Sequence, residues 1–290
     1  MIKGRLLALV RQVPNSFGQA VSLSQPAGTL IDVALARRQW DAYVGTLRHL
    51  VDEVVEVPAS EDHPECAAIE DLLVFARGSA VLTKPGNPSR RGEAAAVRSS
   101  LENNEGIKGI KLHMMSNMDP QATLNGHDVL FTGKHMFVGL NARTNDAGVE
   151  CLKRAFGKSL PVIPIDLEGI GASAASLKSL VTSLRPGLLC VAANDVGLEV
   201  AGRMADAVGR SSYKAIAVPD EPSANVLSLN SGKWRGALLQ ADRCENSVGL
   251  IRGAFELNEQ NSILEHEMSE FVKAGMGLTS LCVFVESVHT

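Results

Sequence analysis

The chain has 290 residues, of which 45% are hydrophobic and 21% charged, and its formal net charge is −4. These values are typical of a globular protein with a large core, and they give no support for a nucleic-acid or membrane-surface partner. No apolar run is long enough to predict a membrane span, and the N-terminal one is too short for a signal peptide. The five cysteines are odd in number and include no Cys-x-x-Cys. That usage predicts a reducing, cytoplasmic location with neither disulfides nor a metal site.

The first predicted elements are a strand, a helix and a second strand. Residues 6–10 are an apolar run that ends at a Pro-Asn-Ser turn. Residues 54–57 are a second short apolar run and predict a buried strand. Between them, residues 29–50 carry apolar side chains three and four positions apart, which is the spacing of one helix face: Val33, Ala36, Trp40, Val44 and Leu47.

An acidic segment follows, and two interpretations of it remain open. Glu65, Glu70 and Asp71 precede a predicted β-hairpin, and the pair Arg90 and Arg91 comes after it. Buried carboxylates need a cation, and an arginine is well suited to bind a carboxylate. The segment therefore indicates a pocket for a molecule with a cationic and an anionic end, such as an arginine-like amino acid. The alternative is a solvated acidic turn before a basic helix start.

The same order of elements recurs along the chain. Hairpins are predicted to begin near residues 71, 128, 177 and 224. A fifth is split between residues 280–285 and residues 6–10. The second hairpin also opens on an acid, Asp128, and an arginine, Arg143, follows it. Extra strands precede the hairpins at residues 54–57, 110–113, 162–165 and 214–217.

These repeats predict a closed ring. A repeat of about 50 residues is too small to bury its own apolar face, so neighbouring repeats must cover one another. We therefore predict a single domain over residues 1–290 with an α/β fold, arranged as a five-bladed, pseudo-symmetric, pentein-like propeller. Side chains at the strand starts would converge on the axis, where Glu70, Asp71 and Asp128 would meet.

Several segments resemble one known family. They are Pro-Glu-Cys-x-x-Ile-Glu-Asp at 64–71, Lys-Pro-Gly-Asn-Pro-Ser-Arg-Arg at 84–91, Asp-Val-Leu-Phe-Thr-Gly at 128–133 and Phe-Val-Gly-Leu-x-x-Arg-Thr-Asn at 137–145. Val-Pro-Asp-Glu at 218–221 and Lys-Ala-Gly-Met-Gly-Leu-Thr-Ser-Leu-Cys at 273–282 extend the match. Together they resemble the dimethylarginine dimethylaminohydrolase family of the guanidino-group-modifying superfamily. The last segment is most similar to the vertebrate second isoform.

The resemblance implies a fold, an activity and a set of binding residues. Family members adopt a five-fold α/β propeller and cleave methylated arginines to citrulline and a methylamine, without a cofactor. A cysteine thiolate attacks the guanidinium carbon while a histidine handles the leaving amine and the water. By resemblance, Glu65, Glu70 and Asp71 would hold the guanidinium nitrogens, and Arg90 and Arg143 would hold the α-carboxylate.

The catalytic positions depart from the family's pattern. Ser176 stands where the family has its histidine, and Asn125 stands where it has the acid that orients that histidine. Ser280 occupies the usual nucleophile position, and Cys282 follows two residues later. The loop at Val13 would cover the pocket and offer a backbone carbonyl to the ligand's amino group. Residues 168–173 resemble an insertion.

Two functions follow from these departures. The first is a weakly active or non-catalytic homologue that binds an arginine-like molecule or a protein partner. The second is an active hydrolase with Cys282 as nucleophile, which requires a shifted register because Cys282 lies roughly 6–7 Å beyond Ser280 along a strand. His127 is either a structural residue or a substitute for the absent general acid.

Overall fold

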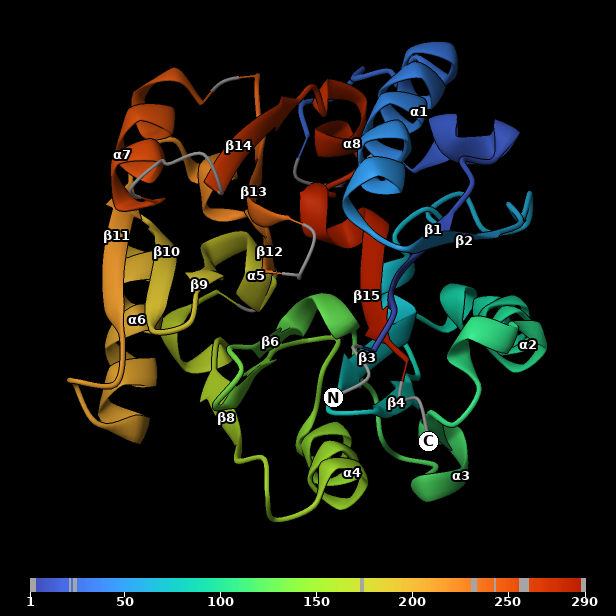
Figure 1. The fold of residues 1–290 in the computed structure, drawn as a ribbon, viewed down its shortest axis with the longest axis horizontal. Coiled ribbons are helices and arrows are strands. Elements are labelled where there is room, and N and C mark those ends of the chain that lie inside the picture. The colour runs from blue at the N-terminus through green and yellow to red at the C-terminus, as the bar shows by residue number, and fades with distance from the viewer. Residues whose placement is uncertain are drawn as a thin grey trace.

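The computed structural model describes residues 4–20, 22, 25–172, 175–230, 234–242, 244–255 and 261–287. In this part of the chain the strands form five sheets of three strands each, and the sheets surround a common centre (Figure 1). The strands, sheet by sheet, are β1 Leu6–Arg11, β2 Glu53–Val57 and β15 Cys282–Glu286; β3 Leu73–Ala76, β4 Ser79–Leu82 and β5 Lys111–Met114; β6 Val129–Phe131, β7 Met136–Leu140 and β8 Val162–Asp166; β9 Val181–Arg185, β10 Leu188–Ala192 and β11 Lys214–Val218; and β12 Leu227–Asn230, β13 Arg235–Gln240 and β14 Asn261–His266. The predicted α/β propeller is confirmed.

Each sheet has the same construction, an antiparallel pair extended by one parallel strand. In the second sheet, β3 pairs antiparallel with β4, and β4 pairs parallel with β5. The turn between β3 and β4 uses Arg77 and Gly78, which both have positive φ angles of 49° and 75°. Two positive φ angles match the right-handed twist of the flanking strands, so the hairpin follows directly from this local sequence.

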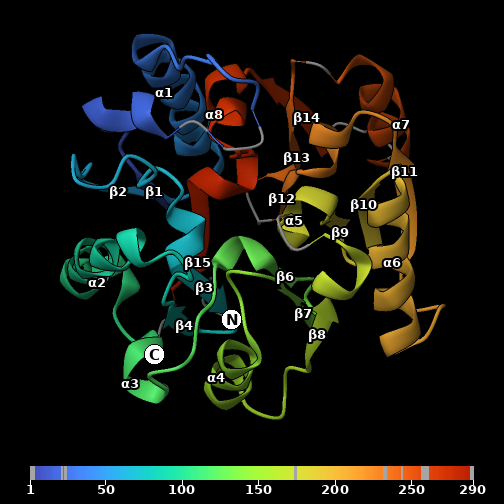
Figure 2. The same ribbon diagram turned by 180° about the vertical axis from the view of Figure 1, so that it is seen from behind.

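Helices lie on the outside of the ring and connect the strands of each sheet (Figures 1 and 2). The long ones are α1 Val33–Leu50, α2 Ala94–Asn103, α4 Asp146–Phe156, α6 Asp195–Val208 and α7 Glu245–Phe255. Helix α1 begins later than the predicted residue 29, because the carboxylate of Asp32 caps it by accepting from Leu35 N at 3.0 Å. No described helix combines the length and the apolar character needed to cross a lipid bilayer.

The remaining helical segments are short. They are α3 Met115–Met118, α5 Leu177–Leu180 and α8 Ser269–Lys273, and the 3-10 turns η1 Asn15–Gln19, η2 Ile69–Leu72, η3 Pro88–Glu93, η4 Glu105–Ile107, η5 Gly126–Asp128, η6 Glu168–Ile170, η7 Glu221–Ala224 and η8 Leu278–Leu281. The turn predicted at 230–232 falls partly outside the described residues, as does residue 173 of the segment resembling an insertion.

The first and last strands of the chain pair and close the ring, as the sequence predicted. Strand β15 runs antiparallel to β1, from Leu6 opposite Glu286 to Val10 opposite Cys282. Strand β2 then adds to β1 in parallel. The extra strands, by contrast, join the hairpin that comes before them in the chain, because the helix between is a crossover that returns the chain to the same sheet. The sequence analysis also missed the fifth of these strands, β14.

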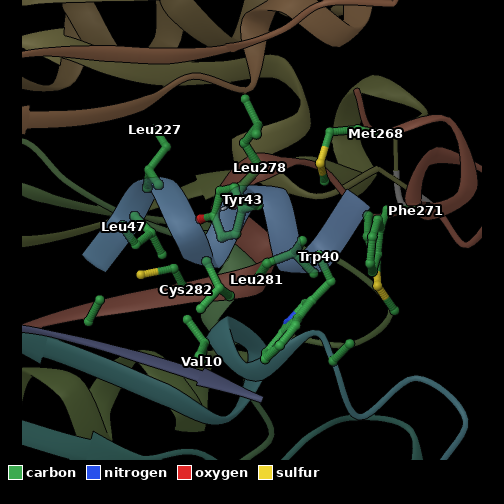
Figure 3. Packing of buried hydrophobic residues seen from close by; sticks show 14 of the residues in the cluster. Val10, Trp40, Tyr43, Leu47, Leu227, Met268, Phe271, Leu278, Leu281 and Cys282 are labelled. Atoms are coloured by element: carbon green, nitrogen blue, oxygen red, sulfur yellow. Dashed lines mark hydrogen bonds between the residues drawn. The ribbon is translucent and has the colours of Figure 1, made fainter. Parts of the chain in front are cut away.

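The inner face of α1 packs on the closing sheet and forms one of the hydrophobic cores. Trp40, Tyr43 and Leu47 on this helix lie against Leu278 and Cys282 (Figure 3). The spacing of the apolar residues that predicted the helix is therefore also the spacing that buries it.

Leu47→Ala should destabilise the protein, whereas Leu30→Ala should not. Leu47 is 0% exposed and Leu30 is 80% exposed, so the same chemical change creates a cavity only at the first position. We expect the free energy of unfolding to fall by about 2–5 kcal/mol for Leu47→Ala and by less than about 0.5 kcal/mol for Leu30→Ala. Urea unfolding monitored by circular dichroism would measure both, and equal losses would contradict the packing of α1.

Candidate functional site

Five short helical turns meet at the centre of the ring. Each lies directly before the strand that opens a hairpin, namely β3, β6, β9, β12 or β15, and they are η2, η5, α5, η7 and η8. Turn η2 contacts η5 and η8, and α5 contacts η5 and η7. Because every repeat places such a turn at the same end of its first strand, polar side chains from all five repeats reach one region.

A cavity of about 510 Å³ lies on these turns. Its lining includes most of the residues that the sequence analysis singled out: Glu65, Asp71, Arg90, Asn125, Arg143, Ser176 and Ser280. His127 lines the same cavity. Glu70, Cys282 and Val13 are not part of this lining. One cavity therefore gathers two carboxylates, two guanidinium groups, an imidazole and four hydroxyls from distant parts of the chain.

Arg90 is buried beneath this cavity and is held by the protein's own acceptors. Its Nη1 donates to the carboxylate of Asp71, and its Nε donates to Glu93 Oε1 at 2.7 Å. Its Nη2 donates to the backbone carbonyls of Glu65 and Ala68 at 3.3 and 3.2 Å. Although burial alone would lower it, the charges of Asp71 and Glu93 raise the pKa of Arg90. A ligand carboxylate would therefore have to share this guanidinium group.

A second arginine completes the buried chain of charges. Arg11 Nη1 donates to Glu93 Oε2 at 3.1 Å, and Arg11 Nε donates to Pro58 O at 3.0 Å. Burial raises the pKa of Asp71, but the charge of Arg90 outweighs this effect and leaves that pKa below its ordinary value. Within this network of Arg11, Glu93, Arg90 and Asp71, every charge thus has an opposite partner, as burial requires.

Glu70 turns away from the cavity and joins a different set of partners. Its carboxylate accepts from Lys178 Nζ, and from Thr279 Oγ1 at 2.8 Å. It lines a second cavity of about 190 Å³, which Cys282 also lines. Burial raises the pKa of Glu70 to about 7, although Lys178 and Thr279 both stabilise the charged form. Lys178 and Thr279 therefore already stabilise the carboxylate of Glu70 before any ligand is bound.

Asp128 lies near the axis but bonds only to protein groups. Its carboxylate accepts from Asn141 Nδ2 at 2.8 Å, from Thr144 Oγ1 at 2.6 Å and from Leu177 N at 3.3 Å. Burial raises its pKa to about 6. It joins the ends of neighbouring repeats and is absent from the lining of the 510 Å³ cavity.

The two positions that resemblance assigned to the histidine and its orienting acid are not bonded to each other. Ser176 Oγ lies 2.9 Å from His127 Nδ1. Asn125 instead accepts through Oδ1 from Gly86 N at 3.3 Å, and its own N donates to Thr144 Oγ1 at 3.1 Å. The imidazole of this cavity is therefore that of His127, which contacts the side chain at position 176.

Ser280 and Cys282 lie in different environments. Ser280 belongs to the turn η8, lines the 510 Å³ cavity, and accepts through Oγ from Gly277 N at 3.1 Å. Cys282 begins β15 and packs in the hydrophobic core beside Tyr43 (Figure 3). Burial, and then the nearby charge of Glu70, raise the pKa of the Cys282 thiol well above its ordinary value. A thiolate nucleophile is therefore strongly disfavoured at Cys282.

The loop at Val13 is tied to neighbouring side chains. Val13 packs in the hydrophobic core, and its carbonyl accepts from Arg37 Nη2 at 3.4 Å. The carboxylate of Glu61 accepts from Asn15 N and Ser16 N, both at 2.9 Å. The carbonyl that resemblance offered to a ligand's amino group is thus bonded to Arg37 here.

Three residues that contact Glu70 or His127 were missed from the sequence: Lys178, Thr279 and Asn225. Lys178 comes two residues after Ser176, and Thr279 comes directly before Ser280 within the segment 273–282. The sequence therefore indicated that both residues lie next to the site. Asn225 opens the fourth predicted hairpin, as Asp71 and Asp128 open the first two. The repeat could have placed it at the axis, but nothing in the sequence indicated its partners.

Cys282 should resist alkylation in the folded protein. Its side chain is 3% exposed, and its raised pKa keeps it as the unreactive thiol at neutral pH. We expect peptide mass spectrometry to find Cys282 unmodified after treatment of the native protein with iodoacetamide, and fully modified after treatment in denaturant. Stoichiometric labelling of Cys282 in the native protein would contradict this placement.

Comparison with known proteins gives relatives along nearly the whole chain. The chain is 28% identical over 284 residues to the Bos taurus protein named "Putative hydrolase DDAH2". The aligned residues cover 97% of this chain and 94% of that protein. The chain is 36% identical over 160 residues to the N(G),N(G)-dimethylarginine dimethylaminohydrolase of Streptomyces coelicolor, or 54% of this chain and 57% of that one. No protein-family model matches.

A solved protein structure has the same fold as this chain. The DDAH of Pseudomonas aeruginosa, in complex with citrulline, superposes with a TM-score of 0.76 at 21% sequence identity. The superposition covers 96% of this chain and 98% of that one. At this identity the likeness concerns the fold alone.

Proposed function

From the premise that the chain is related in sequence and fold to the dimethylarginine dimethylaminohydrolase family, we propose that it binds an arginine-like amino acid without hydrolysing it. The observation that carries this proposal is the lining of the 510 Å³ cavity. It contains two carboxylates and two guanidinium groups, and the described lining holds no cysteine. A zwitterionic amino acid needs both signs of charge, whereas hydrolysis in this family needs a thiolate.

The charged groups of the cavity suit the two ends of such a ligand. Arg143 lines the cavity, and its positive charge acts on Glu65 and Asp71. In the proposal, Arg143 and Arg90 bind the α-carboxylate, and Glu65 and Asp71 face the polar distal group. Burial raises the pKa of Glu65 above its ordinary value, although the charges of Arg90 and Arg143 oppose this effect.

The serine and histidine side chains of the cavity do not supply an activated nucleophile. A serine hydroxyl attacks only when a neighbouring base takes its proton, whereas a thiol is partly ionised by itself near neutral pH. Ser280 Oγ already accepts from Gly277 N, and His127 is bonded to Ser176. Ser280 should therefore be inert towards a guanidinium carbon.

The rival function is a hydrolase that uses Cys282. Cys282 lines the second cavity, of about 190 Å³, together with Glu70, and its raised pKa disfavours the thiolate. Hydrolysis by Cys282 would require β15 to shift against β1 so that the thiol enters the other cavity. Citrulline release from dimethylarginine by the purified protein, abolished by Cys282→Ala, would overturn our proposal.

Calorimetry with arginine, dimethylarginine and citrulline tests the binding function. Arg143→Ala should weaken binding of whichever amino acid gives heat by at least about tenfold, because a charge-assisted contact to the carboxylate is lost. Arg210→Ala removes an exposed arginine from the surface and should change the affinity by less than about twofold. No heat with any of the three amino acids would refute the proposed function.

Ser280→Cys should not create a working hydrolase. The variant restores a thiol to the cavity but not a group that can protonate the departing amine. We expect no steady citrulline formation from dimethylarginine, and at most slow covalent modification by amidine reagents. Ser176→His and Asn125→Asp would have to be added before turnover is measurable. Steady turnover by Ser280→Cys alone would show that His127 already supplies the proton, and the non-catalytic proposal would fail.

A further inference from the structure

Three side chains from three different repeats form a chain of hydrogen bonds at one side of the 510 Å³ cavity. Asn225 Nδ2 lies 3.2 Å from His127 Nε2, and His127 Nδ1 lies 2.9 Å from Ser176 Oγ. Ser176 and His127 line the cavity, while Asn225 is buried behind them. The order serine, histidine, asparagine resembles a catalytic triad, so the positions of the hydrogens decide what it can do.

The orientation of the Asn225 amide is fixed by two backbone groups. Its Oδ1 accepts from Thr279 N at 3.0 Å, and its Nδ2 donates to Lys178 O at 3.0 Å. A reversed amide would place one N–H against another and one carbonyl against another. A side chain at Gly277 would collide with the side chain of Asn225, so the glycine leaves the room that this asparagine occupies. The NH₂ group of Asn225 therefore faces His127.

This orientation determines the tautomer of His127. An amide NH₂ carries two donors and no acceptor, so His127 Nε2 must be unprotonated. The two hydrogens of Asn225 are shared among His127 Nε2, Lys178 O and Thr279 Oγ1. Glu70 Oε2 lies 3.9 Å from His127 Nε2, which is too far to hold a hydrogen there by a direct bond. The hydrogen of the neutral ring is thus on Nδ1, where it is donated to Ser176.

The charged groups around the ring also favour its neutral form. Burial lowers the pKa of His127 to about 4, and the positive charges of Lys178 and Arg143 contribute in the same direction. Asp71 opposes them, and Glu70 is occupied by Lys178. His127 should therefore remain uncharged across the neutral range of pH.

Ser176 is then a donor to whatever fills the cavity. Because His127 Nδ1 donates to it, the imidazole cannot take its proton, and Ser176 is not an activated nucleophile. One lone pair of its oxygen is occupied by this bond, and its own hydrogen is directed elsewhere. A guanidinium group offers only donors, whereas a ureido or amide group also offers an acceptor oxygen.

We propose that Asn225 is a positioning residue that holds His127 as a neutral Nδ1–H donor, so that Ser176 donates to the ligand and favours a distal group with an acceptor oxygen, as in a ureido amino acid. The balance of charges in the lining points the same way. Glu65 and Asp71 are offset by Arg90 and Arg143, so a ligand without net charge fits better than a cation. The statement about the ligand rests on the proposed function, whereas the statement about His127 does not.

Nuclear magnetic resonance of the ¹⁵N-labelled, unliganded protein tests the histidine. The signal of His127 is identified by its loss in His127→Gln. We expect a protonated Nδ1, an unprotonated Nε2 and no titration between about pH 5.5 and about pH 8. In Asn225→Asp, a carboxylate beside Nε2 should move the hydrogen to that nitrogen and raise the pKa by at least about one unit. An Nε2–H tautomer or an imidazolium near pH 6 in the wild type would overturn the inference, whether or not Asn225→Asp folds.

Calorimetry with citrulline and arginine tests the ligand. Ser176→Ala should weaken citrulline binding about tenfold and arginine binding by less than about twofold. Only citrulline has a distal oxygen that accepts the hydrogen bond from the Ser176 hydroxyl. Ser211→Ala removes an exposed hydroxyl and should leave both affinities unchanged. Equal losses for the two amino acids would overturn the preference for an acceptor oxygen. No heat with either would refute the proposed function and the statement about the ligand, while the resonance experiment still decides the role of Asn225.

Discussion

The pairing of β1 with β15 is the constraint on which this structure depends. Just beyond the ends of these strands, Arg5 N donates a hydrogen bond to Ser287 Oγ, although the two residues are 282 positions apart in the chain. The entropy lost on closing a loop grows only slowly with its length. Burial of the apolar face of the sheet can therefore offset the entropy lost in this long closure. Without it, η8 would not reach the centre, and Thr279 would not meet Glu70, 209 positions away.

Closing the ring places charges where water is scarce, and their pairing then limits what the centre can bind. Arg90 and Asp71 bond to each other, and Glu70 bonds to Lys178. A buried ion pair is costly to break, since removing one partner leaves an uncompensated charge. A ligand can therefore add to these pairs but cannot easily replace a member of them. This condition favours a ligand whose own charges cancel over one that brings an extra cation.

Most of the fold could be predicted from the sequence, because turns and apolar runs are local signals that recur. The site was predictable where a residue's position in the repeat decides its place, as for Asp71 and Arg143. The site could not be predicted where the geometry of a single turn determines which side chain reaches the cavity. Ser280 lies in a 3-10 turn and only Cys282 begins the strand, so the alternation of strand side chains does not relate the two positions. Pairings such as Glu70 with Lys178 depend on how distant repeats meet, which no local pattern encodes.

Positions 127 and 176, where the sequence differs from the pattern of the family it resembles, are separate in the sequence but adjacent in space. By resemblance, Ser176 stands at the position of the family's histidine. His127 lies in the segment Gly-His-Asp at 126–128, and the two side chains are in direct contact although 49 positions separate them. A short side chain at 176 leaves room that a ring at 127 can occupy. Exchanges that conserve the total volume of a packed site are the ones that it tolerates best. The imidazole that lines the cavity comes from the second repeat, and its two ring nitrogens contact Ser176 and Asn225.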